Sequence, residues 1–166
     1  MTHRIGIGQD SHKFIDNKPL FLGGVNIPDH PGLFGNSDGD AVLHALCNAI
    51  SSAMGKGSIG TYADKLCSEN KITDSKEYLK TIFKTLQENS FKINNISISV
   101  EAKTPKIEPY SDAMKNVIAE ILKIEKNQIG ITATTGEGLT AFGRGEGVAV
   151  IATAVILNDF DRELKR

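Results

Sequence analysis

The sequence predicts an α+β protein, a two-layer sandwich in which a mixed four-stranded sheet carries helices on one face. Segments of alternating apolar and polar residues, typical of strands, are interleaved with segments whose apolar residues recur at helical spacing. Residues 148–157 are apolar almost throughout, as in a central strand buried on both faces. Because one helix layer would leave the second sheet face uncovered, we expect an oligomer packed sheet to sheet.

The first strand is expected over residues 4–14, where apolar and polar residues alternate. Ile5 and Ile7 fall on one face, and the other face receives a row of small and polar residues: Gly6, Gly8, Asp10 and His12. Residues 19–28 follow with two short β segments around the glycine pair at 23–24, which predicts a hairpin.

The first helix is expected over residues 38–54, with Ser37 as its N-cap and Asp40 three residues later as a variant capping box. Its apolar stripe is Val42, Ala45, Leu46, Ala49, Ile50 and Ala53. A polar stripe on nearly the opposite face is Asp40, His44, Asn48 and Ser51. Residues 55–73 are polar and irregular, which predicts a mobile loop.

The remaining elements alternate between helix and strand. A second helix is expected over residues 75–88, followed by a strand over 96–102. Pro109 suits the first turn of a third helix. Residues 128–135 form another alternating strand, and the apolar strand 148–157 closes the sheet.

Composition limits the classes of partner. The 166 residues carry 19 basic and 20 acidic side chains, a formal charge of −1, with 40% hydrophobic residues. We therefore expect one domain over residues 1–166, with a charged tail at 158–166, and neither nucleic acid nor a membrane as partner. A chain of this size folds without a structural metal, so a metal site would serve chemistry.

Cysteine usage and the N-terminus indicate a cellular compartment. Cys47 and Cys67 lie far apart and form neither a CxxC pair nor a disulfide framework, which indicates a reducing environment. The first residues lead directly into a strand, without the apolar segment of a signal peptide. We expect a cytoplasmic protein.

The strongest chemical signal combines Asp10, His12 and His44. Residues i and i+2 of a strand project to the same side, and we expect Gly6 and Gly8 to leave room beside them. His44 would complete an Asp/His/His set with an open fourth position, the arrangement of catalytic zinc. The alternative is that each histidine is a surface residue or a hydrogen-bonded core residue.

A second signal is the Thr- and Gly-rich segment of residues 132–147. Its backbone N–H groups could cradle phosphate, Arg144 could clamp it, and Glu137 could hold magnesium on it. The alternative is an ordinary glycine-rich connection between strands. The glycines at 143–147 precede a strand, so they match neither a dinucleotide fingerprint nor a P-loop.

A third segment, residues 102–107, places a proline and two lysines at a strand end. Its rigid backbone could read a base edge while Lys106 meets phosphate. An ordinary loop between strand and helix is the alternative.

In order and spacing, these motifs together resemble the 2-C-methyl-D-erythritol 2,4-cyclodiphosphate synthase family over residues 4–157. The motifs are RIGIGQDSHKF, GGVNIP, GLFGNSDGDAVLHAL, the turn at residues 57–60, AKTPKI and TATTGEG followed by GRGEG. The resemblance implies a homotrimer whose sheets face inward, with active sites between subunits, and a trimer axis that can accept an isoprenoid diphosphate near Arg144 and Glu146.

The resemblance also implies the ligands. Zn²⁺ would bind to Asp10, His12 and His44, and Mg²⁺ or Mn²⁺ to Glu137. Asn36 and Thr135 would act in catalysis, and the cytosine and ribose would lie near residues 102–108 and 58–60. The substrate-binding residues implied are Asp10, His12, Asn36, Ser37, Ser58, Ile59, Gly60, Ala102, Thr104, Pro105, Lys106, Ile107, Glu108, Thr134, Thr135, Glu137, Ala141 and Arg144.

The implied substrate is 4-diphosphocytidyl-2-C-methyl-D-erythritol 2-phosphate. Its own 2-phosphate would attack the β-phosphorus, releasing CMP and closing the cyclic diphosphate without a protein nucleophile. The enzyme would then neutralise charge and fix an in-line geometry.

The chain departs from the family pattern at several positions. Asn36 stands where most members have His, Asn48 and Ser58 each replace an Asp, and residues 62–64 read Tyr-Ala-Asp where Phe-Pro-Asp is usual. Asn36 can donate a hydrogen bond to phosphate but cannot carry a proton. These substitutions motivate one alternative, a non-catalytic trimeric protein that binds nucleotides or isoprenoid phosphates. A second alternative is a metal-dependent phosphohydrolase that uses the open zinc position to activate water.

Overall fold

The computed structural model describes residues 2–158, apart from the side chains of residues 61, 62 and 64. The predicted charged tail lies, except for its first residue, outside this range. The strands are β1 (His3–Ile15), β2 (Leu20–Leu22), β3 (Val25–Ile27), β4 (Gly32–Leu33), β5 (Phe91–Glu101), β6 (Ile129–Thr134) and β7 (Gly147–Asn158). The α-helices are α1 (Ala41–Ala53), α2 (Gly60–Asn70), α3 (Ser75–Glu88) and α4 (Glu108–Leu122), with short 3-10 turns at 126–128 and 136–138.

The main sheet is mixed and has the strand order β4-β1-β7-β5-β6. Only β5 and β6 pair in parallel; the other neighbours are antiparallel. The expected four-stranded sheet therefore gains a fifth strand, β4, which pairs its two residues with the end of β1. Two residues are too few for an alternating pattern, so this strand has no sequence signal. The predicted hairpin forms the separate β2-β3 pair.

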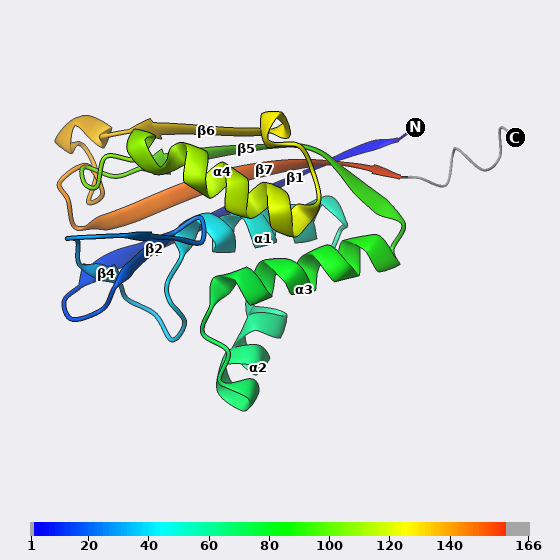
Figure 1. The fold of residues 1–166 in the computed structure, drawn as a ribbon, viewed down its shortest axis with the longest axis horizontal. Coiled ribbons are helices and arrows are strands. Elements are labelled where there is room, and N and C mark those ends of the chain that lie inside the picture. Colours follow the sequence, from blue (N-terminus) through cyan, green and yellow to red (C-terminus); the bar gives the residue numbers. More distant parts are fainter. Residues whose placement is uncertain (1, 159–166) are drawn as a thin grey trace, which may run out of the picture.

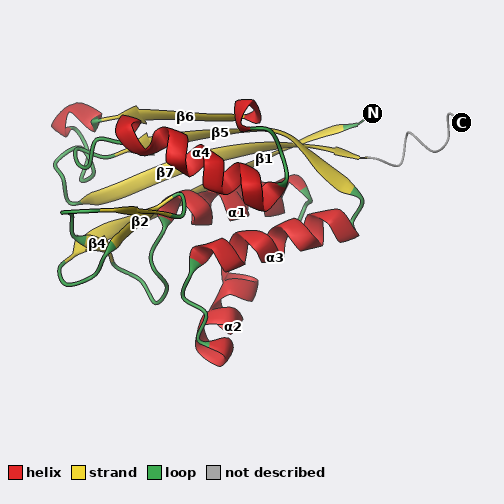
Figure 2. Ribbon diagram, in the orientation of Figure 1, coloured by secondary structure: helices red, strands yellow, loops and turns green. Residues whose placement is uncertain are grey.

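Helices α1, α3 and α4 cover one face of this sheet, and α2 extends away from it (Figures 1 and 2). The covered face is built from alternate residues of the two central strands, including Val100, Val150 and Ala152, all fully or almost fully buried. The α+β two-layer prediction is thus confirmed. Of the helices in residues 2–158, none is both long and apolar enough to cross a membrane.

Within residues 2–158, no helix covers the opposite face of the sheet (Figure 1). Ile5 and Ile7 on β1 are 73% and 64% exposed, and Ile151 on β7 is 46% exposed. β7 is central, as predicted, but it is buried on one face only. The expected packing of sheet against sheet in an oligomer stays a prediction.

Helix α1 begins three residues later than expected. Its N-cap is Asp40, not Ser37: the buried Asp40 carboxylate accepts from Leu43 N at 3.0 Å and from Gly23 N and Gly24 N at 2.9 and 2.7 Å. Two members of the predicted polar stripe are buried: Asp40 fully and Ser51 almost fully. A buried carboxylate with three backbone donors outcompetes a hydroxyl cap.

Two other segments differ from the prediction. The expected mobile loop at 55–73 contains helix α2, whose weak apolar periodicity and missing side-chain cap left no clear signal. Strand β5 begins five residues before the expected position, because a register shift between Ile93 and Asn95 interrupts its alternation. The other helices and strands begin and end close to the expected residues.

Candidate active site

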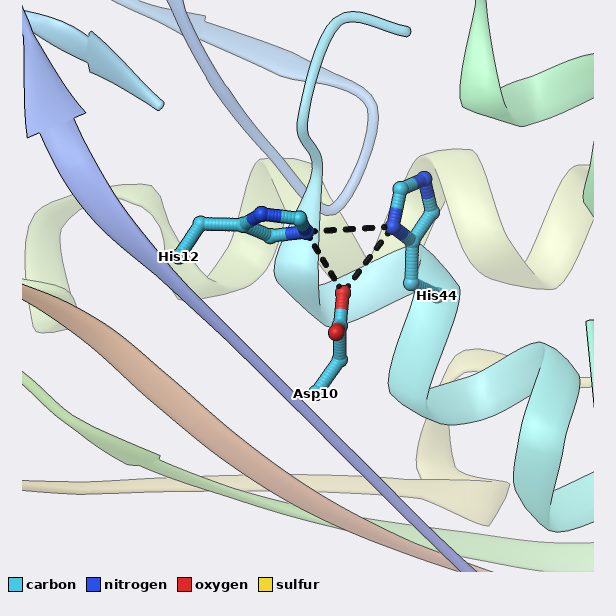
Figure 3. Close-up of side chains that lie close together, drawn as sticks. All are labelled: Asp10, His12 and His44. Atoms are coloured by element: carbon cyan, nitrogen blue, oxygen red, sulfur yellow. Dashed lines mark hydrogen bonds and ion pairs between the residues drawn. The ribbon is translucent and has the colours of Figure 1, made fainter. Parts of the chain in front are cut away.

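Asp10, His12 and His44 converge on one point between β1 and the first turn of α1 (Figure 3). Asp10 Oδ2 lies 2.8 Å from His12 Nε2 and 2.9 Å from His44 Nδ1, and the two ring nitrogens are 3.4 Å apart. All three side chains are partly buried, with 12–23% of their area exposed. The structure thus brings the predicted trio together.

Glycines in β1 place His44 beside the strand. A Cβ added to Gly6 would lie 2.0 Å from Ala49 O, and one added to Gly8 would lie 2.1 Å from Ala45 O. The expectation that these glycines leave room for the ligands is therefore wrong: the α1 backbone fills that space. This close packing brings His44 within reach of Asp10.

Electrostatics favour an ionised aspartate between the histidines. Burial alone would raise the pKa of Asp10, but hydrogen bonds from His12 and His44 and their positive charge lower that pKa well below its ordinary value. The hydrogen bond to Asp10 raises the pKa of His12, against the effect of burial. The cluster therefore holds an anionic carboxylate oxygen beside two imidazole nitrogens.

This donor set fits a divalent transition metal. Ligand atoms of a tetrahedral zinc site with bonds of about 2.0–2.1 Å lie roughly 3.4 Å apart. The observed separations of 2.8, 2.9 and 3.4 Å need only small side-chain adjustments to reach this spacing. Two imidazoles and one carboxylate also form the three-ligand set of catalytic zinc, which leaves a position for water or substrate.

The loop before α1 lies next to this cluster. Ser37 Oγ is 3.4 Å from His44 Nε2. Asn36 is exposed, and its backbone carbonyl accepts a hydrogen bond from Cys67 Sγ at 3.5 Å. Lys18 holds the loop: its ammonium donates to the carbonyls of Leu33, Gly35 and Ser37 at 2.8, 3.2 and 2.6 Å. Sequence reasoning missed Lys18, since a single lysine after a strand carries no signal.

Asn48 connects the turn at residues 57–59 to strand β1 through hydrogen bonds. Asn48 Oδ1 accepts from Ile59 N at 2.8 Å, and Asn48 Nδ2 donates to Gln9 O at 3.4 Å. A hollow of about 230 Å³ opens between this turn and β1, and Asn48 and Ser58 are among the residues that line it. Gly60 opens helix α2.

A second group of predicted residues gathers at the ends of β5 and β6. Ala102 N donates to Thr134 O at 3.0 Å and Lys103 N to Phe142 O at 3.2 Å, which places residues 102–108 beside the glycine-rich loop. Ala102, Pro105 and Ile107 are buried there, while Thr104, Lys106 and Glu108 are exposed.

The glycine-rich loop has its own hydrogen bonds. Thr135 Oγ1 donates to Glu137 Oε1 at 2.7 Å, and Thr134 Oγ1 accepts from Gly136 N at 3.2 Å. Glu137 has a positive φ of 48°, and its carboxylate is directed at the Thr135 hydroxyl. Arg144 Nε donates to Glu146 Oε1 at 2.9 Å, and the Ala141 carbonyl accepts a hydrogen bond from Glu146 N at 3.0 Å.

Within one chain, the trio and the residues that follow β6 lie apart. Across the sheet, Asp10 on β1 pairs with Val150 on β7. Val150 pairs with Val100 on β5, which in turn pairs with Ala133 on β6. Three strand spacings of about 4.8 Å separate the trio from β6 by roughly 14 Å. Within the described residues, Glu137 is not among the ligands grouped with the trio.

Comparison with known proteins places the chain in a family. The YgbB family model matches residues 3–157. A relative from Chlamydia trachomatis named 2-C-methyl-D-erythritol 2,4-cyclodiphosphate synthase is 45% identical over 158 residues, 93% of this chain and 88% of that protein. One of the same name from Chlamydia felis is 44% identical over 159 residues, 94% and 90% of the two chains.

Solved structures support the same family assignment. A 2C-methyl-D-erythritol-2,4-cyclodiphosphate synthase structure described as a CDP-bound form superposes with a TM-score of 0.84 at 30% identity and covers 93% of this chain and all of that one. The bifunctional IspDF from Campylobacter jejuni gives 0.86 at 37% identity, covering 93% of this chain and 42% of that longer one. The chain belongs to the YgbB family, together with these 2-C-methyl-D-erythritol 2,4-cyclodiphosphate synthases.

Proposed function

We propose that this chain cyclises 4-diphosphocytidyl-2-C-methyl-D-erythritol 2-phosphate to 2-C-methyl-D-erythritol 2,4-cyclodiphosphate with release of CMP, in the non-mevalonate isoprenoid pathway. The observation that carries the proposal is the convergence of Asp10, His12 and His44 in a chain 45% identical to a synthase of that name. Relatives solved with CDP support a cytidine diphosphate ligand.

The metal ions would occupy two positions. Asp10, His12 and His44 offer the ligand set of Zn²⁺, and the exposed Glu137 carboxylate offers a ligand to Mg²⁺ or Mn²⁺. Divalent ions bound there would neutralise the charges of the phosphate groups that must approach each other.

The chain's own residues would bind and orient the phosphates. Ser37 lies beside the trio and Asn36 precedes it in the same loop; both can donate hydrogen bonds, and the Lys18 ammonium fixes this loop. Thr134 and Thr135 offer hydroxyls at the other group, with Thr135 already directed at Glu137. An oxygen of the 2-phosphate attacks the β-phosphorus, the bond from that phosphorus to the bridging oxygen breaks, and CMP leaves with that oxygen.

The nucleoside would be held by main-chain groups. The backbone of residues 102–108 would receive the cytosine, with Ala102, Thr104, Pro105, Lys106, Ile107 and Glu108 around it. The turn of Ser58, Ile59 and Gly60 would receive the ribose, where Ser58 offers one hydroxyl. Ala141 and Arg144 would complete the phosphate side.

We further propose a homotrimer with active sites between subunits. The roughly 14 Å between the trio and β6, the strand that leads into the glycine-rich loop, supports a site in which one subunit's trio faces its neighbour's loop. The uncovered isoleucines of β1 and β7 support inward-facing sheets. The exposed Arg144 and Glu146 would lie near the axis, where the cationic side chain could meet an isoprenoid diphosphate.

Phosphorus NMR tests the activity directly. With the cytidyl substrate, zinc and magnesium, we expect CMP and the cyclic diphosphate to appear together and both to stop on addition of a chelator. A linear phosphomonoester instead would indicate a phosphohydrolase. Tight binding of the substrate without turnover, in protein shown to carry metal, would indicate a binding protein on the same fold.

A further inference from the structure

We propose that Asp38 and Ser75 are positioning residues for the metal centre, forming a carboxylate–hydroxyl relay that fixes the His44 ring with Nδ1 directed at the metal position. The proposal rests on the proposed function in that it takes the trio to hold a metal ion. It assigns a role to two residues that contact none of the reacting groups.

The relay reaches His44 from the start of helix α3. Ser75 is the first residue of that helix and is fully buried. Its Oγ lies 2.8 Å from His44 Nε2, on the opposite side of the ring from Asp10. Ser75 Oγ donates to Asp38 Oδ1, and Ser75 N donates to Asp38 Oδ2 at 3.0 Å.

Proton counting sets the direction of the relay. A serine hydroxyl has one proton, and the contact with the Asp38 carboxylate requires that proton because both oxygens would otherwise present lone pairs. Ser75 Oγ can then only accept from His44, so His44 Nε2 carries the hydrogen. With its hydrogen on Nε2, the neutral imidazole binds a metal ion through Nδ1, the nitrogen that faces Asp10 Oδ2 at 2.9 Å.

Further contacts hold Asp38 and the His44 ring in place. Asp38 N donates to Thr73 O at 2.8 Å, and its carboxylate also accepts from Asp40 N at 3.2 Å. One turn along α3, the buried Tyr78 ring lies against His44 with centroids 6.0 Å apart. The imidazole thus contacts α3 through both a hydrogen bond and a ring face, and Ser75 alone in α3 is placed to select its tautomer.

The Ser75→Ala variant tests the relay with zinc alone as the probe. Outer hydrogen-bond partners of metal-bound histidines typically contribute about 10–100-fold to metal affinity. We expect the zinc Kd, measured by competition with a chromophoric chelator, to rise by about that factor. The matched control is Ser111→Ala, a buried serine in α4, a helix that contributes no ligand to the trio; this variant should leave the Kd unchanged.

Two further readouts separate positioning from a packing defect. In zinc-loaded wild-type protein, NMR should show a slowly exchanging His44 Nε2 proton, which Ser75→Ala should lose while the His12 signals persist. Asp38→Asn, which keeps one acceptor oxygen but not the charge, should weaken zinc binding less than Asp38→Ala.

Equal zinc affinity in the Ser75→Ala and Ser111→Ala variants, with an unchanged His44 Nε2 proton, would overturn the relay. A wild-type protein that binds zinc through the trio but never cyclises its substrate would instead contradict the proposed function, and the relay would still be supported by the ratio of the two zinc constants.

Discussion

At the scale of single residues, the trio is held by side chains that contact each other directly. His44 has Asp10 on one ring nitrogen and Ser75 on the other, so its ring is fixed from both sides. Its neighbours Leu43 and Ala45 are fully buried, so the core of α1 does not depend on the imidazole. A substitution at His44 should therefore separate chemistry from folding.

We expect His44→Ala to lose stoichiometric zinc and to reduce turnover more than about 100-fold, because even outer partners of such ligands contribute 10–100-fold. The free energy of unfolding should fall by about 1–3 kcal/mol, the range for lost buried hydrogen bonds. Metal analysis and denaturant unfolding measure both, with His3→Ala, an exposed histidine at the start of β1, as control. A variant that keeps full zinc would refute the ligand assignment.

Lys18 is the second residue with a separable role. Its ammonium donates to three carbonyls of the loop that carries Asn36 and Ser37. Lys18→Met should lower the free energy of unfolding by about 1–3 kcal/mol and reduce kcat/KM, since the loop loses all three donors. Lys13→Met, which removes a cation stacked on Phe34 at 4.9 Å, is the matched control and should cost less than about 1 kcal/mol. Equal effects of the two variants would rule out a specific role for Lys18.

At the scale of elements, the contact between β1 and α1 determines the site. The backbone of α1 touches β1 where Gly6 and Gly8 lack side chains. Any side chain there would push the helix outward and move His44 away from Asp10. The strand glycines are thus as necessary to the cluster as its ligands.

Gly8→Ala should destabilise the fold by at least about 3 kcal/mol, the upper range of overpacking, because the new Cβ would lie 2.1 Å from Ala45 O. It should also abolish zinc binding. Gly130→Ala in β6 is the control, since its Cβ would meet nothing closer than 3.9 Å, and a change within about 1 kcal/mol is expected. Urea unfolding distinguishes the two, and similar midpoints would contradict the packing argument.

The sequence predicts the parts of this site that depend on periodicity. Asp10 and His12 follow from the two-residue repeat of a strand, and His44 from its place in an amphipathic helix. Helix α2 could not be predicted, because its apolar residues lack a clear repeat and no side chain caps it.

Other features depend on contacts between distant segments. Asp40 displaces Ser37 as N-cap because the hairpin amides of Gly23 and Gly24 point at its carboxylate. Ser75 reads in the sequence as an ordinary helix start, and only the fold brings it to His44. Such partners are set by tertiary packing, which local patterns do not encode.

At the scale of the whole molecule, the sheet divides the proposed active site. The trio lies on β1, and the glycine-rich loop follows β6, three strands away. In a trimer with sites between subunits, each site takes its trio from one chain and its loop from the next. Two inactive variants should then complement each other, provided that each damages a different half.

We expect His44→Ala and Glu137→Ala to be almost inactive when each is prepared alone. Co-expressed in equal amounts, they should form mixed trimers in which about a quarter of the sites pair an intact trio with an intact loop, by random assortment in a cyclic assembly. Turnover per subunit should therefore recover to roughly a quarter of the wild-type value. Two variants of the same half, His12→Ala and His44→Ala, are the control and should recover nothing. Failure of the first pair to recover, in trimers shown by mass spectrometry to be mixed, would mean that both halves of each site come from one chain.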